Sequence, residues 1–107
     1  MRVEKECGYI EFELPDIAEG MILFGKMGID PEGIKKKTDE EINEDFIYIG
    51  KLIKNCGYLV TKLELKGREG KVYTSYGEAI KDFTMIEIVT AMATEIAKSL
   101  RLDVEKK

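Results

Sequence analysis

Two cysteines are the side chains of this sequence best suited to metal or redox chemistry, and each opens the tripeptide CGY, at residues 7–9 and 56–58. Structural zinc sites and thioredoxin-like redox sites use closely paired thiols, typically CxxC, and neither copy has a second cysteine nearby. A disulfide would need Cα atoms within about 7 Å and an oxidising compartment, and nothing in the sequence indicates either. We therefore interpret Cys7 and Cys56 as buried free thiols, and the repeated tripeptide as coincidence.

Acid–base and metal chemistry have little support in the remaining residues. The chain has no histidine, the side chain that most often serves as general base or zinc ligand. The acidic run DEEINED at 39–45 lacks the alternating ligand order of a calcium loop. Carboxylates in such a run suit the first turn of a helix, where the backbone dipole favours negative charge. We expect no enzymatic activity, no metal and no cofactor.

The charge distribution argues against nucleic acid and membrane partners. The net charge is -4, with 7 basic and 13 acidic side chains in residues 1–53 and 10 basic and 8 acidic in residues 54–107. Neither half has the concentrated basic face that binds a phosphate backbone. No stretch is apolar for long enough to span a bilayer, and the first residues have no apolar signal core. We expect a cytoplasmic protein that binds neither nucleic acids nor membranes.

Periodicity and capping signals divide the chain into elements. Residues 9–14 alternate between apolar and polar, which is typical of a half-buried strand. Helix starts are indicated by Asp16 with Glu19, Thr38 with Glu41, Ser75 with Glu78 and Thr84 with Glu87, and helix ends by Gly28 and Gly57. The predicted elements are a strand over about 2–14, helices over about 15–27 and 39–56, a hairpin over about 59–66 and 71–74, and helices over about 75–82 and 84–100.

This order, β-α-α-β-β-α-α, predicts an α+β domain. We expect a small antiparallel sheet of about three strands, packed on one face by three or four helices. A length of 107 residues fits a single domain, which we place at residues 1–102, with 103–107 as a frayed tail.

The helix over 15–27 has more apolar side chains than one small sheet can cover. Ile17, Met21 and Phe24 form one stripe, and further apolar residues occupy most of the circumference. Methionine is flexible and can shape an adaptable binding surface, although these side chains could equally fill an irregular core. Met85 and Met92, in the stripe of the last helix, we assign to the core. The candidate partner-binding residues are Met21, Leu23, Phe24, Met27, Ile47 and Tyr48.

The layout of the chain resembles the tail assembly chaperones of tailed bacteriophages and prophages. The resemblance lies in the segment IEFELPDIAEGMILFGKMGID, the capped helix before NCGYLV, the short hairpin and the closing TSYGEAIKDFTMIEIVTAMATEIA. It implies a non-enzymatic, self-associating protein of the bacterial host cytoplasm. Such a protein binds the long, helical tape measure protein and keeps it soluble during tail assembly. Family members are often also made in a frameshifted, extended form, and this chain would correspond to the short one.

A second hypothesis is a small acidic phage or host regulator that blocks a partner protein through its acidic N-terminal half. Both hypotheses predict a protein partner. A chaperone should bind amphipathic helices in a salt-tolerant way, whereas an acidic regulator should release a basic partner as salt rises.

Overall fold

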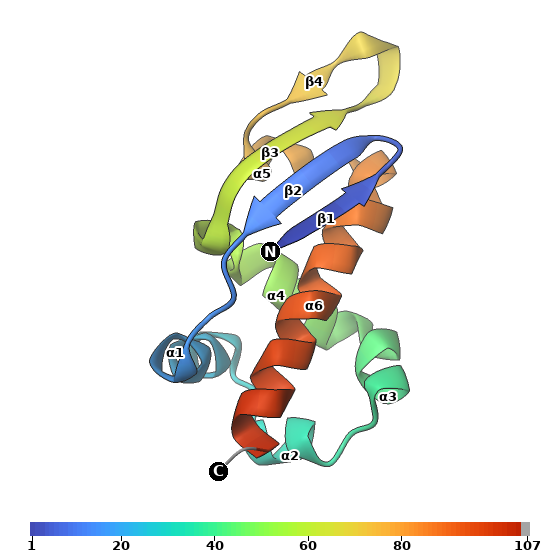
Figure 1. Ribbon diagram of the computed structural model, residues 1–107. Helices are drawn as coiled ribbons and strands as arrows, with labels where there is room; N and C mark the ends of the chain where they lie inside the picture. Colours follow the sequence, from blue (N-terminus) through green and yellow to red (C-terminus); the bar gives the residue numbers. More distant parts are fainter. Residues whose placement is uncertain (106–107) are drawn as a thin grey trace.

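An antiparallel sheet crosses one end of the molecule, above a long C-terminal helix (Figure 1). The structure, a computed structural model, describes residues 1–105, and of Lys35, Asp39 and residues 101–105 it describes the backbone alone. The strands are β1 (Arg2–Lys5), β2 (Gly8–Phe12), β3 (Val60–Lys66) and β4 (Val72–Tyr73), and they lie in the order β1-β2-β3-β4. The predicted α+β class is confirmed.

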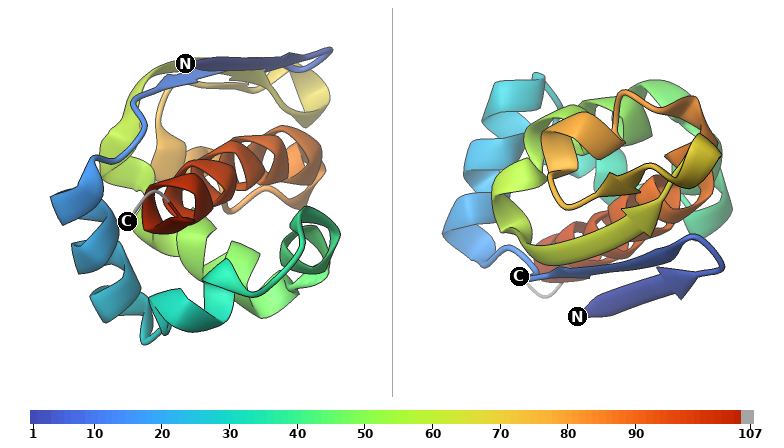
Figure 2. Two further views of the ribbon diagram at one scale, coloured as in Figure 1. Left: turned by 60° about the horizontal axis from the view of Figure 1, so that its bottom comes forward. Right: turned by 90° about the horizontal axis from the view of Figure 1, so that it is seen from above.

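The helices gather on one face of this sheet (Figure 2). They are α1 (Ile17–Met27), α2 (Pro31–Lys35), α3 (Asp39–Glu44), α4 (Phe46–Asn55), α5 (Tyr76–Ala79) and α6 (Ile86–Glu105). Three short 3₁₀ segments lie between the longer elements: η1 (Gly57–Leu59) between α4 and β3, η2 (Arg68–Gly70) between β3 and β4, and η3 (Phe83–Met85) between α5 and α6. Among the described residues, no helix combines the length and apolar character needed to cross a membrane.

The region predicted as one strand over 2–14 is a hairpin of two strands. β1 pairs with β2, and β2 then pairs with β3, all antiparallel. Gly8, the first residue of β2, has a φ of 139°, and a Cβ there would collide with the main-chain oxygen of Glu64. Only glycine combines this backbone conformation with so close an approach. The first CGY tripeptide is therefore part of a tight turn between strands.

The helix predicted over 39–56 is interrupted at Asp45. The backbone of this residue has φ -81° and ψ 84°, so α3 ends and α4 begins there. Its carboxylate accepts hydrogen bonds from the amide of Tyr48 (3.0 Å) and from Nζ of Lys37 (2.7 Å). Asp45 is therefore the N-cap of α4, although the apolar pattern of the sequence predicts one continuous helix through this position.

The predicted helix boundaries before α1 and α3 are confirmed in their bonding. At α1, the amide of Glu19 donates to Asp16 (2.8 Å) and the amide of Asp16 donates to Glu19 (3.1 Å). Thr38 and Glu41 form the same reciprocal pair before α3. Gly28 ends α1 in the left-handed conformation, as expected.

Other predicted boundaries are wrong. Gly57 does not take the left-handed conformation but opens η1, and a Cβ there would lie 2.8 Å from the ring of Tyr76. Asp82 takes the capping role that was predicted for Thr84. Its carboxylate accepts a hydrogen bond from the amide of Thr84 at 2.9 Å. Ser75, expected to cap the next helix, makes no side-chain capping bond to α5. The backbone of α6 continues to Glu105, beyond the predicted end, and residues 106–107 of the predicted tail lie outside the described part of the chain.

The core surrounds α6, which packs against the inner face of the sheet and against helices α1 to α4. The sheet contributes Ile10, Phe12, Leu63 and Leu65, all buried. The predicted stripe of the last helix is confirmed, because Met85, Val89, Met92, Ile96 and Leu100 are all buried. Its two methionines therefore fill core space, as expected.

The hydrogen bonds of the Asp45 carboxylate should contribute measurably to the stability of the fold. Two hydrogen bonds hold the pKa of Asp45 below its ordinary value of 3.8. The larger effect comes from the bond donated by Lys37, and the smaller from the bond donated by the amide of Tyr48. We expect Asp45→Ala to lower the free energy of unfolding by about 1 kcal/mol at pH 7, as for a lost N-cap. Asp45→Asn, which keeps a capping oxygen but not the charge, should cost less. Urea denaturation measures both.

The pH dependence follows from the lowered pKa. Stabilisation by the ionised carboxylate is fully present above the unfolded-state pKa and is lost as pH falls through the lower folded-state value. The stability difference between wild type and Asp45→Asn should therefore shrink as pH falls below 3.8. A difference that stays constant into acid would show that the charge of Asp45 contributes nothing.

Candidate functional site

The cysteines do not form a reactive site. Both thiols are free; Cys56 is buried at the end of α4, whereas Cys7, expected to be buried, is only half-buried in the turn between β1 and β2. Burial raises the pKa of the Cys56 thiol, although a contact with the hydroxyl of Tyr76 at 3.7 Å opposes the shift. A buried thiol with a raised pKa is a poor nucleophile. Among the described residues, no group of three or more histidine, cysteine or acidic side chains is placed to hold a metal.

The six predicted partner-binding residues divide into two exposed and four buried. Met21 and Ile47 project from the surface, with relative exposures of 59% and 73%. The other four, which we expected at the surface, lie in the core: Leu23, Phe24, Met27 and Tyr48. The structure thus corrects their placement, and the reason differs between the two helices.

On α1, a glycine determines which side faces inward. A Cβ at Gly20 would lie only 2.7 Å from Cδ2 of Leu100, so α1 and α6 pack tightly at this point. Leu23, Phe24 and Met27 are three, four and seven positions further on and therefore lie on the same side of the helix. Glycine inside a helix costs about 1 kcal/mol relative to alanine. The sequence alone does not single out Gly20, because Gly25 carries the same cost on the exposed side of the same helix.

On α4, the cap at Asp45 orients Tyr48 inward. Tyr48 is 1% exposed, and its hydroxyl has no hydrogen-bond partner among the described residues. Burial, with a smaller contribution from the charge of Asp45, raises the pKa of this hydroxyl. Its neighbours Phe46 and Ile47 point outward instead. Tyr48 therefore belongs to the interior, and Ile47 is the exposed member of the predicted pair.

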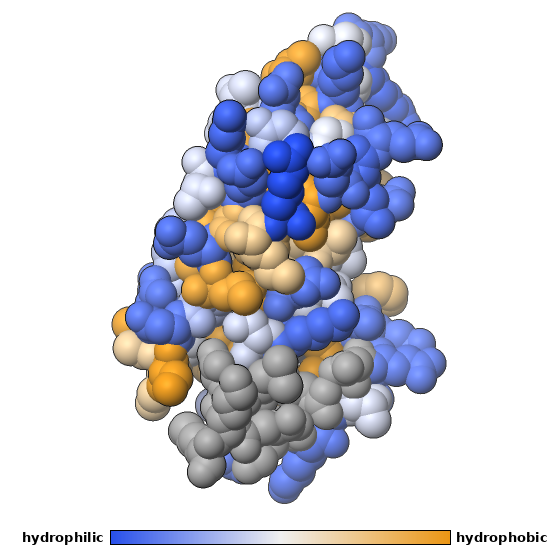
Figure 3. All heavy atoms as spheres, in the orientation of Figure 1, coloured by the Kyte–Doolittle hydropathy of each residue, from blue (hydrophilic) through white to orange (hydrophobic). Residues whose placement is uncertain are grey.

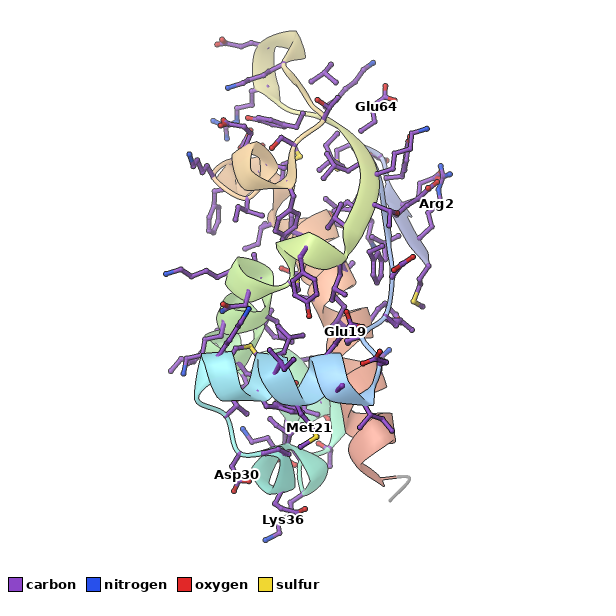
Figure 4. The ribbon with its side chains drawn as sticks, turned by 90° about the vertical axis from the view of Figure 1, so that its left-hand side faces the viewer. Arg2, Glu19, Met21, Asp30, Lys36 and Glu64 are labelled. Atoms are coloured by element: carbon purple, nitrogen blue, oxygen red, sulfur yellow. The ribbon has the colours of Figure 1, made fainter. Side chains whose placement is uncertain are left out.

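The opposite side of α1 is apolar and uncovered. We call it the α1 patch and define it as Ile17, Ala18, Met21, Ile22 and Gly25, all of them exposed. The three largest side chains in it have relative exposures of 57% to 60%. Apolar surface is visible over α1 at the lower left of Figure 3, and Figure 4 looks onto this helix, with Met21 labelled. Sequence reasoning identified Met21 but missed the other four residues.

Charged residues border the α1 patch without entering it. Glu19, whose carboxylate is engaged in the cap of α1, lies near the N-terminal end, and Lys26 is exposed in the last turn. Among the described residues, the most exposed large apolar side chains are Phe46 with Ile47 at the start of α4, and Phe83 in η3. Scattered exposed hydrophobic residues are normal in proteins, whereas five contiguous uncharged positions on one helix face are not.

No protein-family model matches the chain, and no curated protein or solved structure matches it significantly.

A charge introduced on the buried side of α1 should destabilise the fold, whereas a charge on the exposed side should leave its stability almost unchanged. Leu23→Glu or Met27→Glu places a carboxylate in the core, where an unpaired charge is severely destabilising, and should lower the melting temperature sharply or prevent folding. Met21→Glu, on the exposed side, should change the free energy of unfolding by no more than about 0.5 kcal/mol. Thermal unfolding followed by circular dichroism compares them. A collapse of Met21→Glu would place the α1 patch in the interior.

Proposed function

We propose that the protein is a non-enzymatic protein-binding module that captures an amphipathic helix of its partner on the α1 patch. The observation that carries this proposal is an uncharged helix face left open to solvent on a small domain whose core is already filled. Exposed apolar patches bordered by polar residues mark interaction sites in soluble proteins.

The spacing within the α1 patch suits another helix. Ile17 and Met21 are four residues apart, as are Ala18 and Ile22, so the side chains form the ridges that interdigitate when helices pack. Ala18 and Gly25 add almost no bulk and leave space for a second backbone to approach. Met21 can adapt its conformation to differing partner side chains. An amphipathic helix buries its apolar face in such a surface.

The proposal agrees with the resemblance to tail assembly chaperones. A chaperone of that kind binds a long helical protein that would otherwise aggregate, and it needs an apolar, adaptable surface rather than a catalytic site. We propose by analogy that the partner is a long helical protein kept soluble in the bacterial host cytoplasm. Open reading frames for a tail tube protein upstream and a very long helical protein downstream would support this assignment.

A binding experiment tests the proposal directly. The probe is a fluorescently labelled amphipathic helical peptide of leucine, lysine and glutamate with no net charge, titrated with protein and followed by anisotropy. Wild type should bind it, and Met21→Glu should weaken binding about tenfold or more, because a charge in the centre of an apolar contact must be desolvated. Phe83→Glu, which also replaces a highly exposed apolar residue but lies outside the α1 patch, should bind like wild type.

Salt separates this function from that of an acidic regulator. Apolar capture should persist when sodium chloride rises from about 0.05 M to about 0.5 M, whereas binding steered by exposed charges should weaken steeply. If wild type ignores the neutral peptide but binds a basic one that salt releases, the regulator hypothesis replaces the present one.

A further inference from the structure

The outer edge of β1 is an unpaired strand edge. β1 is the first strand in the sheet order and has only β2 beside it among the described residues. The amide of Phe12 donates to the oxygen of Met1 at 2.9 Å, and the register continues this pairing at Val3 and Lys5. In an antiparallel ladder, alternate residues direct their main-chain groups to opposite sides. The N–H and C=O groups of Arg2 and Glu4 therefore face away from the sheet, where another strand can pair with them.

The charges along this edge would complement one another if two copies of β1 lay antiparallel. Those of Arg2 and Glu4 lie on the outer face of the sheet, where Figure 4 labels Arg2, and that of Val3 is half-buried on the inner face. We propose that a second copy of the chain pairs antiparallel with β1 about a two-fold axis at Val3. Arg2 of each copy then lies opposite Glu4 of the other, and Val3 lies opposite Val3. Opposite charges at directly facing positions stabilise an antiparallel pair.

A groove beneath the same edge offers room for the inward side chains of the second copy. The groove lies between β1 and α6 and has a volume of about 450 Å³. Its α6 wall consists of Glu87, Thr90, Ala91, Thr94 and Glu95, three of them small. Because β1 and α6 run in opposite directions (Figure 1), Lys5 of the second copy, opposite Met1, would approach the Glu95 end of this wall.

One feature of the edge opposes pairing. Lys5 points inward from β1 and lies 3.7 Å from Glu87 of its own chain, and inward-pointing charges are one means by which edge strands avoid association. The short edge and this charge together imply a weak dimer that forms at high protein concentration. The proposal is independent of the α1 patch, which lies on a different element.

Charge reversal and charge exchange test the register. Sedimentation velocity at protein concentrations up to about 1 mM should detect wild-type dimers in the weak range expected of such a contact. Glu4→Arg places like charges opposite one another twice in the symmetric pair and should raise the dimer dissociation constant about tenfold. The double variant Arg2→Glu, Glu4→Arg exchanges the charges, keeps the pairing complementary and should dimerise like wild type. Within its own chain Arg2 contacts Glu4 (2.8 Å) and Glu11 (3.3 Å), so the double variant loses the contact with Glu11. These side chains are exposed or half-exposed, so the loss of stability should stay within about 1 kcal/mol, and thermal unfolding of both variants checks that they fold.

Hydrogen exchange identifies the edge independently. The amide of Glu4 should exchange rapidly in dilute protein and slowly in concentrated protein, whereas that of Val3, paired with β2, should be protected at both concentrations. Met21→Glu should dimerise like wild type, so failure of the α1 proposal leaves this one intact. A chain that stays monomeric, a dimer unaffected by Glu4→Arg, or a double variant no better than the single one would overturn the proposal.

Discussion

The close contact between α1 and α6 at Gly20 and Leu100 determines which surface the protein presents. Apolar residues occupy most of the circumference of α1, so hydrophobic burial alone does not fix its rotation. Successive residues are 100° apart on a helix, and turning α1 by one position would move Met21 toward the core and Leu23 toward solvent. At Gly20 the absence of a Cβ lets the helix approach Leu100, and this orientation brings Leu23, Phe24 and Met27 into the core.

The consequence is a helix that is stable in place yet apolar on its outer side. Full burial of a large apolar side chain contributes about 1.5 to 3 kcal/mol, so the inward residues suffice to hold α1 against α4 and α6. The outward residues, Ile17, Met21 and Ile22, then contribute little to folding. Side chains that are dispensable for folding but apolar and exposed are available for binding, which is why the α1 patch is the leading functional surface.

Local signals in the sequence predicted some of the features that local bonding determines, although Ser75 makes no capping bond and Asp82 caps in place of Thr84. The reciprocal caps at Asp16 with Glu19 and at Thr38 with Glu41 involve residues three apart, and they form as predicted. Features that depend on distant contacts could not be predicted in the same way. Gly8 matters because of Glu64, and Gly57 because of Tyr76. The same holds for the candidate site. The sequence shows that α1 has more apolar residues than the core can cover, but which side of α1 is exposed depends on Leu100 of α6.

The two proposed contacts use different elements, and this separation bears on how they would act together. Pairing through β1 does not use any residue of the α1 patch, which lies on a separate element (Figure 1). A dimer would therefore present two identical apolar faces to one long partner. Binding at the first face raises the effective concentration of the second, so two weak contacts can hold a long helical protein more tightly than either alone, provided that its length spans both. A protein too small to build one large interface could in this way bind a large partner.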